Sequence, residues 1–331
     1  MYRRLTSCLF TRFPYRLLHT IPEPPHDLVS MKPPKNTHVH FYLTNGGSAR
    51  LLDYLKALYK IDNVVFVRLP SFESFFIFDP EEMMKVHHSA SPTPIGLSAA
   101  IFPFTEFYSK YQNKYNATPI SYNINPQSWL PQRHAIQKGI FDREEAFYYL
   151  PVVSKVTKDA TNLLPKYWND IDKYLTRVAF ELVYAILFGN RVNVLDLEHA
   201  DAEDLRYLQT SSNATSLAGK LYLNPYGHMI PKYEFLSDEQ KEFIRMEDLE
   251  DWNSFIENNH AVLDISKTRI GEILEGGDEK PQPLVARYRK DKILSLDELI
   301  VNVAGLIFEA MDLTAKTILW VRISFTVRSI N

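Results

Sequence analysis

The most extended helical pattern of the chain covers residues 295–320, where apolar side chains recur every three or four positions and no proline intervenes. This spacing is typical of one continuous α-helix. Ser295 and Glu298 have the spacing of a capping box, in which the hydroxyl and the carboxylate each accept a backbone N–H. The segment therefore predicts a single capped helix of about 39 Å, at about 1.5 Å per residue.

Two acids, Glu309 and Asp312, interrupt this apolar pattern. A helix that is apolar nearly all round is normally buried. A buried carboxylate must be paired, protonated or functional, because an unpaired charge is costly to remove from water. These two acids are therefore the first candidates for a functional site.

Strand-like patterns are concentrated near the start of the chain. Residues 64–69 and 75–78 are rich in β-branched and aromatic side chains and predict a hairpin with a five-residue loop. Before them, residues 51–59 predict a short amphipathic helix. After them, Asp79 and Pro80 have the features of an N-cap and a first helical position.

The remainder of the chain has helical periodicity and almost no strand pattern. Helices are predicted at residues 128–141, 143–169 (one or two), 171–188 (ended by Gly189), 202–218 and 237–274 (one or two). Residues 90–126, 221–231 and 278–292 are predicted as loops and connections. The fold class that follows is mainly α with a small β-hairpin near the amino terminus.

Composition excludes some classes of protein. With 331 residues and 45% hydrophobic content, the chain can bury a large core. Its formal net charge is -3 and no basic block stands out, so nucleic acid is not an expected partner. No apolar run approaches the roughly 20 residues that a membrane-spanning helix needs.

The first 22 residues differ from the rest of the chain. They contain four arginines and no acid, with hydroxyl residues between apolar ones. This composition is typical of a mitochondrial transit peptide, and an ordinary basic arm is the alternative. Residues 23–36 are proline-rich and predict an extended linker. The one cysteine of the sequence, Cys8, lies in the first segment, so residues 23–331 contain no thiolate ligand or cysteine nucleophile.

Trp129 and Arg133 place an indole N–H and a guanidinium one turn apart on a predicted helix. Two such donors suit an anion, because arginine binds carboxylate or phosphate through a planar fork. Ser128 is expected to cap this helix and leave Pro131 in the first turn. The alternative is that the pair only packs and carries a surface charge.

Ala310, Asp312 and Thr314 lie within about one turn of the long helix. A small residue allows close approach to the helix backbone, and an acid near a hydroxyl can relay protons. The alternative is purely structural, with Asp312 paired to Lys316 and Thr314 bonded to the preceding turn.

The sequence contains no other recognisable catalytic, metal-binding or nucleotide-binding motif. The ten histidines show no metal-ligand spacing, and no nucleophile-elbow, Walker A or dinucleotide-binding motif is present. We therefore expect no protein metal ligand in this chain. An aromatic cluster favours core or lid packing, although it could line a pocket; its members are Phe102, Phe104, Phe107, Tyr108, Tyr111 and Tyr115.

Taken in order, these motifs resemble the amino-terminal part of a cytochrome P450, most closely of the mitochondrial branch. The hairpin ends in FFIFDPEEMMKV, and W-x-x-x-R follows it. The helix TRVAFELVYAILFGNRV and the capped helix with AMDLTAKTILW come next. The resemblance covers residues 36–320 and implies that residues 37–331 are part of a single, incomplete cytochrome P450 domain.

The resemblance implies a haem-thiolate monooxygenase that inserts oxygen into a lipophilic, sterol-like small molecule. Trp129 and Arg133 would bind a propionate of haem b, and Ala310 would line the oxygen pocket beside the iron. Asp312 and Thr314 would relay protons. A ferredoxin would supply electrons in the mitochondrion, with peripheral association at the inner membrane.

The chain departs from the family pattern at several positions. Leu313 stands where the family has a threonine, and Glu309 stands where it has a small residue. The family's E-x-x-R helix and cysteine loop are not found in residues 1–331. We therefore expect a truncated chain without its axial cysteine, inactive as given. The alternatives are a non-catalytic truncated isoform and an unrelated all-α binding or interaction module.

Overall fold

The computed structural model describes residues 51–68, 73–89, 102–123, 125–141, 143–224, 226–276, 283–290 and 294–330. The predicted targeting segment and linker lie outside these residues. The chain divides into two compact units, one made of residues 1–92 and 222–245 and the other of residues 93–221 and 246–331. The candidate residues named above all belong to the second, larger unit.

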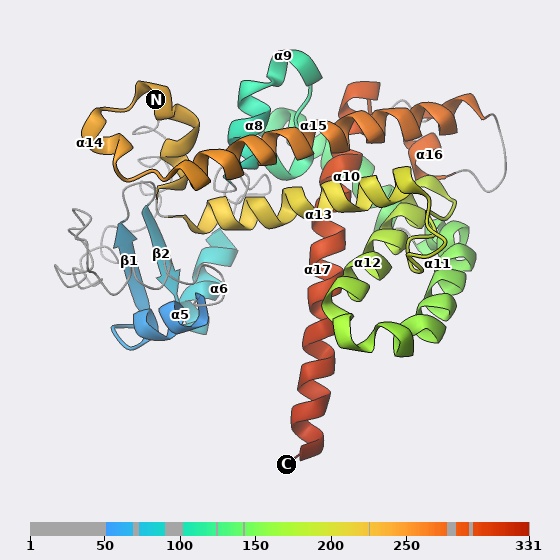
Figure 1. The fold of residues 1–331 in the computed structure, drawn as a ribbon, viewed down its shortest axis with the longest axis horizontal. Helices are drawn as coiled ribbons and strands as arrows, with labels where there is room; N and C mark the ends of the chain where they lie inside the picture. Colours follow the sequence, from blue (N-terminus) through green and yellow to red (C-terminus); the bar gives the residue numbers. More distant parts are fainter. Residues whose placement is uncertain are drawn as a thin grey trace. The chain divides into compact units, whose positions relative to one another are not determined.

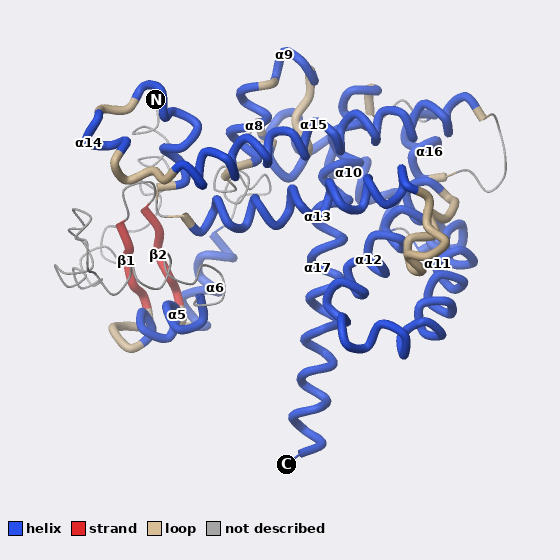
Figure 2. Tube along the Cα trace, viewed as in Figure 1, coloured by secondary structure: helices blue, strands red, loops and turns tan. Residues whose placement is uncertain are grey.

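The smaller unit contains the β-hairpin, which confirms the mainly α fold class with one small sheet (Figure 2). Strands β1 (Val64–Arg68) and β2 (Glu73–Ile77) are antiparallel. The predicted second strand was placed too late, because the ladder extends to the pair of Arg68 with Glu73. Helices α5 (Leu51–Tyr59) and α6 (Pro80–Ser89) flank the hairpin in the sequence.

Asp79 caps α6 as predicted. Its Oδ1 accepts the backbone N–H of Glu81 at 2.8 Å and that of Glu82 at 3.4 Å. The predicted loop at residues 221–231 is wrong in part, because a 3₁₀-helix, η4 (Gly227–Phe235), begins within it. A short helix, α14 (Asp238–Lys241), completes the smaller unit and begins at a capping box on Ser237.

In the described part of the larger unit, every regular element is a helix (Figure 1). Its elements, in order, are α8 (Phe104–Lys110), α9 (Gln112–Tyr115), η2 (Ile120–Tyr122), α10 (Pro126–Phe141), α11 (Arg143–Leu163), η3 (Leu164–Asp170), α12 (Ile171–Phe188), α13 (Ala202–Leu223, within this unit as far as Leu221), α15 (Met246–Glu275), α16 (Leu284–Lys290) and α17 (Leu296–Ile330). No helix in the described ranges is long and apolar enough to cross a lipid bilayer.

The predicted capping box opens α17. The backbone N–H of Ser295 donates to Glu298 Oε2 at 2.8 Å, and the N–H of Glu298 donates to Ser295 Oγ at 3.2 Å. The helix then continues about ten residues past the predicted end, to Ile330. Its first half is buried as expected, whereas Leu313 and Trp320 are each 65% exposed.

Helices α12 and α17 form the centre of the larger unit (Figure 1). Leu175 and Ala179 of α12 pack against Ala315 of α17 in a buried cluster. Small side chains at such a crossing let two helix backbones approach closely. Gly189 ends α12 at φ 73°, a left-handed conformation that glycine adopts without strain, as predicted.

The start of α10 differs from the prediction. The helix begins at Pro126, and Asn125 is its cap, with Oδ1 accepting the N–H of Gln127 at 3.0 Å. Ser128 instead exchanges hydrogen bonds with Asn123, so Pro131 lies inside the helix. Both Asn and Ser are good caps, so the sequence alone did not separate them.

Two segments predicted as irregular contain helices. Residues 278–292 include α16, whose Leu284, Val285 and Tyr288 are buried. Residues 90–126 include α8, and the ring of Phe104 lies 4.8 Å from that of Tyr122 and 5.3 Å from that of Phe308. The aromatic cluster is therefore core packing, because these neighbours are themselves buried.

Close packing of α10 on α16 gives a direct test of the fold. A Cβ added at Gly139 would lie 2.5 Å from the ring of Tyr288 and 2.6 Å from Leu284, inside normal contact distance. We expect Gly139→Ala to lower the free energy of unfolding by about 1–3 kcal/mol, measured by urea denaturation. The control is Gly219→Ala in α13, where a Cβ meets nothing within 4 Å. That variant should gain about 0.5–1 kcal/mol from helix propensity. Equal effects at both sites would contradict this packing.

Candidate functional site

One face of α17 is open and carries two of the predicted site residues. Ala310 and Thr314 are both half-buried and lie one turn apart on the same side. Leu313, about 60° from Ala310 around the helix, is 65% exposed. Met311 and Ala315, about 100° and 140° from Ala310 around the helix, are buried. The side chain of Ala310 therefore leaves the backbone approachable from the open face.

Asp312 does not share this face. Because each residue turns an α-helix by about 100°, Asp312 points about 160° away from Thr314. The helix is continuous from Leu296 to Ile330, so no break brings the two side chains together. The alternative pairing of Asp312 with Lys316 is not formed, and Lys316 Nζ instead lies 3.4 Å from Asp172 Oδ1 of α12. The structure thus groups Ala310 with Thr314 and separates Asp312 from both.

Trp129 and Arg133 lie together on α10, as predicted. The guanidinium carbon of Arg133 is 5.9 Å from the centre of the Trp129 ring. With its amide oxygen turned towards Arg133, Gln137 accepts from Nε and Nη2 at 3.1 Å each. Arg133 is exposed and Trp129 is half-buried. The pair is therefore an accessible cation with an adjacent indole, a donor set that suits a carboxylate.

Glu309 has a defined environment in the structure. Its side chain is half-buried in α17, and the nearby hydroxyl of Ser121 in η2 favours the ionised carboxyl. Burial raises the pKa of this carboxyl above its usual value, while Ser121 and the charge of Arg133 act in the opposite direction. Glu309 also raises the pKa of Tyr122, second to burial of that phenol. The acid that the sequence left unexplained thus belongs to the region of Arg133.

Two partners in this region were missed from the sequence. Gln137 lies four residues after Arg133 in α10, and that spacing alone could have identified it. Ser121 lies 188 positions before Glu309 in numbering and belongs to a 3₁₀-helix that was not predicted. No local pattern joins Ser121 to Glu309, because their contact depends on how η2 packs on α17.

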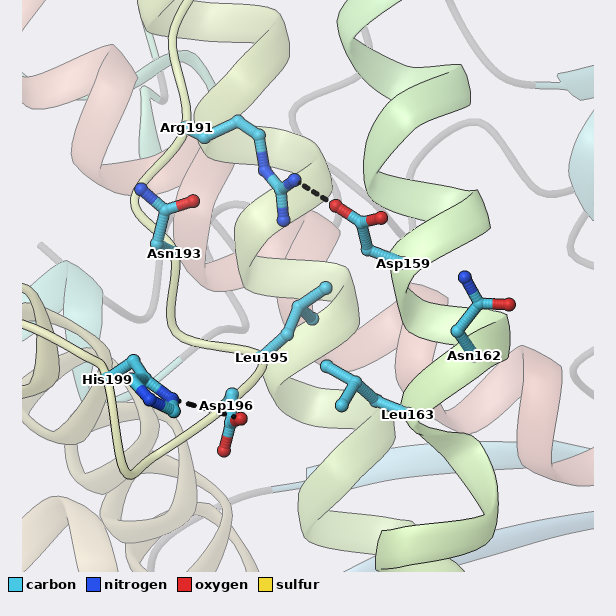
Figure 3. Close-up of a pocket in the computed structure, with 8 residues that line it drawn as sticks. All are labelled: Asp159, Asn162, Leu163, Arg191, Asn193, Leu195, Asp196 and His199. Carbon is cyan, nitrogen blue, oxygen red and sulfur yellow. Dashed lines mark hydrogen bonds and ion pairs between the residues drawn. The ribbon is translucent and has the colours of Figure 1, made fainter.

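A second concave site lies between α11 and the segment after α12 (Figure 3). Its lining residues are Asp159, Asn162, Leu163, Arg191, Asn193, Leu195, Asp196 and His199. The guanidinium of Arg191 forms ion pairs with Asp159 and with the fully buried Glu181. Glu181 Oε2 also accepts the N–H groups of Val194 at 2.9 Å and Leu195 at 3.2 Å. These ion pairs fix the segment after α12, so the charges here are structural.

Asp196, Glu198 and His199 are close enough for one cation to contact all three. The ammonium of Lys166 already lies 2.9 Å from Asp196 and 3.0 Å from Glu198. Lys166 and the Tyr167 hydroxyl hold the pKa of Asp196 well below its usual range. The cluster is thus a surface ion-pair network that supplies its own cation, and it does not point to a metal site.

The Glu181 network makes a stability prediction. We expect Glu181→Gln to lower the free energy of unfolding by about 3–5 kcal/mol. The amide no longer carries the buried negative charge that is paired with the Arg191 guanidinium. Urea denaturation at neutral pH measures this change. The control is Asp170→Asn, which removes the partner of Lys173 on the surface and should cost at most about 0.5 kcal/mol. A comparably small loss for both variants would contradict a structural role for Glu181.

Glu309 makes a prediction about pH. Because its folded-state pKa is raised above 4.5, its contribution to stability is complete below that pH and is lost as the pH rises through the folded pKa. At neutral pH we expect Glu309→Gln to be more stable than the wild type, on the order of 1 kcal/mol. At about pH 4 the two proteins should have the same stability. Urea unfolding across this range measures the difference, and a variant that is less stable at neutral pH would refute it.

Comparisons with known proteins come from sequences and from solved structures. No protein-family model matches the chain. The mitochondrial cholesterol side-chain cleavage enzyme of Macaca fascicularis is 22% identical over 300 residues, which cover 85% of this chain and 53% of that enzyme. Its human counterpart is 25% identical over 179 residues, covering 51% of this chain and 33% of that enzyme. Cytochrome P450 27C1 of Aquarana catesbeiana is 23% identical over 205 residues, covering 59% of this chain and 36% of that protein.

A solved structure, the crystal structure of the cytochrome P450DA heme domain, has the same fold. The TM-score is 0.58 at 13% sequence identity, and the match covers 91% of this chain and 61% of that one. The chain thus spans about half the length of the first curated relative, and its fold is an incomplete cytochrome P450 fold. From its sequence relatives and its fold together, the chain belongs to the cytochrome P450 superfamily.

Proposed function

We propose that this chain is the amino-terminal part of a haem-dependent monooxygenase and that Trp129 and Arg133 bind a haem propionate. The observation that carries the proposal is the exposed Arg133 beside Trp129 on α10. Both side chains can donate hydrogen bonds to a propionate, since the guanidinium is accessible and the neighbouring indole supplies a second N–H.

The open face of α17 supports the same proposal. When bound, haem supplies the oxygen activation of the superfamily. Ala310 leaves room on this face, and the half-buried hydroxyl of Thr314 can hold a proton beside it. Asp312 lies on another side of the helix, so a proton passing from Asp312 to Thr314 would move through intervening water. Leu313 has no hydroxyl and contributes only apolar surface.

The finer assignments rest on the relatives. Relatives from Macaca fascicularis and Homo sapiens are named mitochondrial cholesterol side-chain cleavage enzymes, which supports a mitochondrial location and a lipophilic, sterol-like substrate for this chain. The arginine-rich first 22 residues agree with that location. A ferredoxin-type electron donor and peripheral association with the inner membrane belong to the same proposal.

Haem iron in this superfamily needs an axial thiolate ligand. The one cysteine of the sequence is Cys8, in the segment assigned to targeting. Residues 37–331 therefore contain no thiolate to ligate haem iron. We propose that these residues by themselves can bind haem through its propionates but do not turn over substrate.

Hemin titration of the purified chain tests this proposal. We expect saturable binding, followed by quenching of tryptophan fluorescence, and about a tenfold loss of affinity in Arg133→Ala because a charge-assisted bidentate contact is removed. The control is Arg206→Ala, which removes an exposed arginine from α13 and should leave the affinity unchanged. Equal binding by Arg133→Ala and the wild type would refute the propionate site.

The same samples report the iron ligand. In the reduced, carbon-monoxide-bound state, the absorption spectrum should lack the band characteristic of thiolate ligation. A normal haem-thiolate band would show that the chain supplies a thiolate and would contradict the proposed inactivity.

A further inference from the structure

A histidine of α15, His260, lies among aromatic rings that belong to an earlier part of the chain. The centre of its ring is 5.1 Å from that of Phe107, 4.6 Å from that of Tyr111 and 5.7 Å from that of Tyr115. These three rings come from α8, from the residue that ends α8 and from α9, all within the larger unit (Figure 1). His260 is half-buried there, and it marks the place where α9 meets α15.

Two donors of α9 share one nitrogen of His260. The ammonium of Lys114 lies 3.3 Å from Nδ1, and the hydroxyl of Tyr115 is within hydrogen-bond distance of the same atom. An ammonium can only donate, so Nδ1 has to be the acceptor and carries no hydrogen. These contacts therefore assign the neutral imidazole, with its hydrogen on Nε2.

A proton on Nδ1 would remove this acceptor. The new N–H would face the ammonium of Lys114, and two positive charges would lie side by side. The oxygen of Tyr115 could accept from the new N–H, but the hydroxyl would then lose the acceptor of its own hydrogen. Tyr115 is only 9% exposed, and the described contacts give its hydroxyl no second acceptor. Protonation of His260 therefore weakens the attachment of α9 through both donors.

The surroundings of His260 favour the neutral ring overall. Burial lowers the pKa of His260 below 6.5, the charge of Lys114 lowers it further, and Asp264, one turn farther along α15, acts in the opposite direction. Tyr111 and Tyr115 also face the ring, and a phenol is uncharged at neutral pH. The imidazole is thus neutral at neutral pH, and the charged form appears only below pH 6.5.

Helix α8 has an anchor that does not involve His260. The ring of Phe104 lies 4.8 Å from that of Tyr122, 5.2 Å from that of Phe255 and 5.3 Å from that of Phe308. For α9, by contrast, the hydrogen bonds to α15 within the described residues are those on His260. Loss of these bonds would therefore free α9 and leave α8 in place.

We propose that Lys114, Tyr115 and His260 form an acid-sensitive latch, which is closed while the imidazole is neutral and opens when Nδ1 gains a proton. Opening frees the four residues of α9, Gln112–Tyr115, from α15 and leaves the rest of the larger unit folded. The latch uses none of the residues assigned to haem, so the chain without cofactor is sufficient to test it.

Amide hydrogen exchange, followed by mass spectrometry from about pH 8 to about pH 5, measures opening of the latch. In the closed state the backbone N–H groups of Lys114 and Tyr115 donate to the carbonyl of Tyr111 at 2.9 Å and 3.2 Å. Because the folded-state pKa of His260 is lowered, the latch is stable above the ordinary imidazole pKa and weakens as the pH falls. After correction for the intrinsic effect of pH on exchange, protection of these amides should fall about three- to tenfold, the size expected for one lost hydrogen bond. Amides of α8 and α15 should keep their protection.

Three variants locate the response. His260→Gln has no titrating group, so protection of α9 should be the same at both ends of the pH range. Tyr115→Phe keeps the ring and removes one donor, so protection of α9 should already be about threefold lower at neutral pH. The control is His199→Gln, which removes an exposed histidine paired with Asp196 and should respond to pH as the wild type does. Circular dichroism confirms that each variant is folded.

The latch is overturned if protection of α9 in the wild type does not change across the pH range. It is also overturned if His260→Gln shows the wild-type response, because another group would then be responsible. A loss shared equally by α8 and α15 would show general unfolding and would contradict local release of α9. If His260→Gln does not fold, Tyr115→Phe decides, since wild-type protection in that variant at neutral pH refutes the latch.

Discussion

The packing of α17 against α12 decides which side chains of the candidate site can act. Ala315 lies in a buried cluster with Leu175 and Ala179, and this contact fixes the rotation of α17 about its own axis. Once that face is buried, helix geometry places Ala310 about 140° and Thr314 about 100° from Ala315 around the helix, where both are half-buried. Asp312 lies about 160° from both around the helix, because two residues turn an α-helix by about 200°. A helix with this sequence but another buried face would present a different set of groups.

The polar contacts around η2 depend on this rotation as well. Asn302 and Glu309 leave α17 on one side, where Asn302 accepts the backbone N–H of Ile120 and Ser121 is near enough to lower the pKa of Glu309. Burial makes ionisation of Glu309 unfavourable, and Ser121 and Arg133 offset that cost only in part. In the Glu181 network, by contrast, one carboxylate accepts bonds from Arg191 and from two backbone N–H groups. In the region of Glu309 the guanidinium of Arg133 stays exposed, whereas the Glu181 network satisfies its charges internally.

This difference explains why the concave site of Figure 3 is not the candidate functional site. Its charged residues are engaged in pairs that hold the segment after α12 in place. Arg133 is exposed, and the partner found on its fork is a neutral amide. A cation whose neighbours do not neutralise it is better suited to bind an anionic group than one held by two carboxylates.

The sequence by itself determined the features that depend on neighbours along the chain. These are the capping box of Ser295 and Glu298, the Asp79 cap, the hairpin and the Gly189 helix end, each formed by residues within a few positions of one another. It also gave the pairing of Trp129 with Arg133, since one helical turn brings them together. Local choices between similar caps were less certain, as the start of α10 at Asn125 shows.

Only the tertiary structure decided which groups meet across the fold. Ser121 with Glu309 and Lys316 with Asp172 are far apart in the sequence, so no periodicity relates them. The sequence identified Glu309 and Asp312 as two acids in an apolar helix but could not assign their environments. The packing of α17 assigns the environment of Glu309, because it places this acid near η2. The separation of Asp312 from Thr314, by contrast, follows from helix geometry alone.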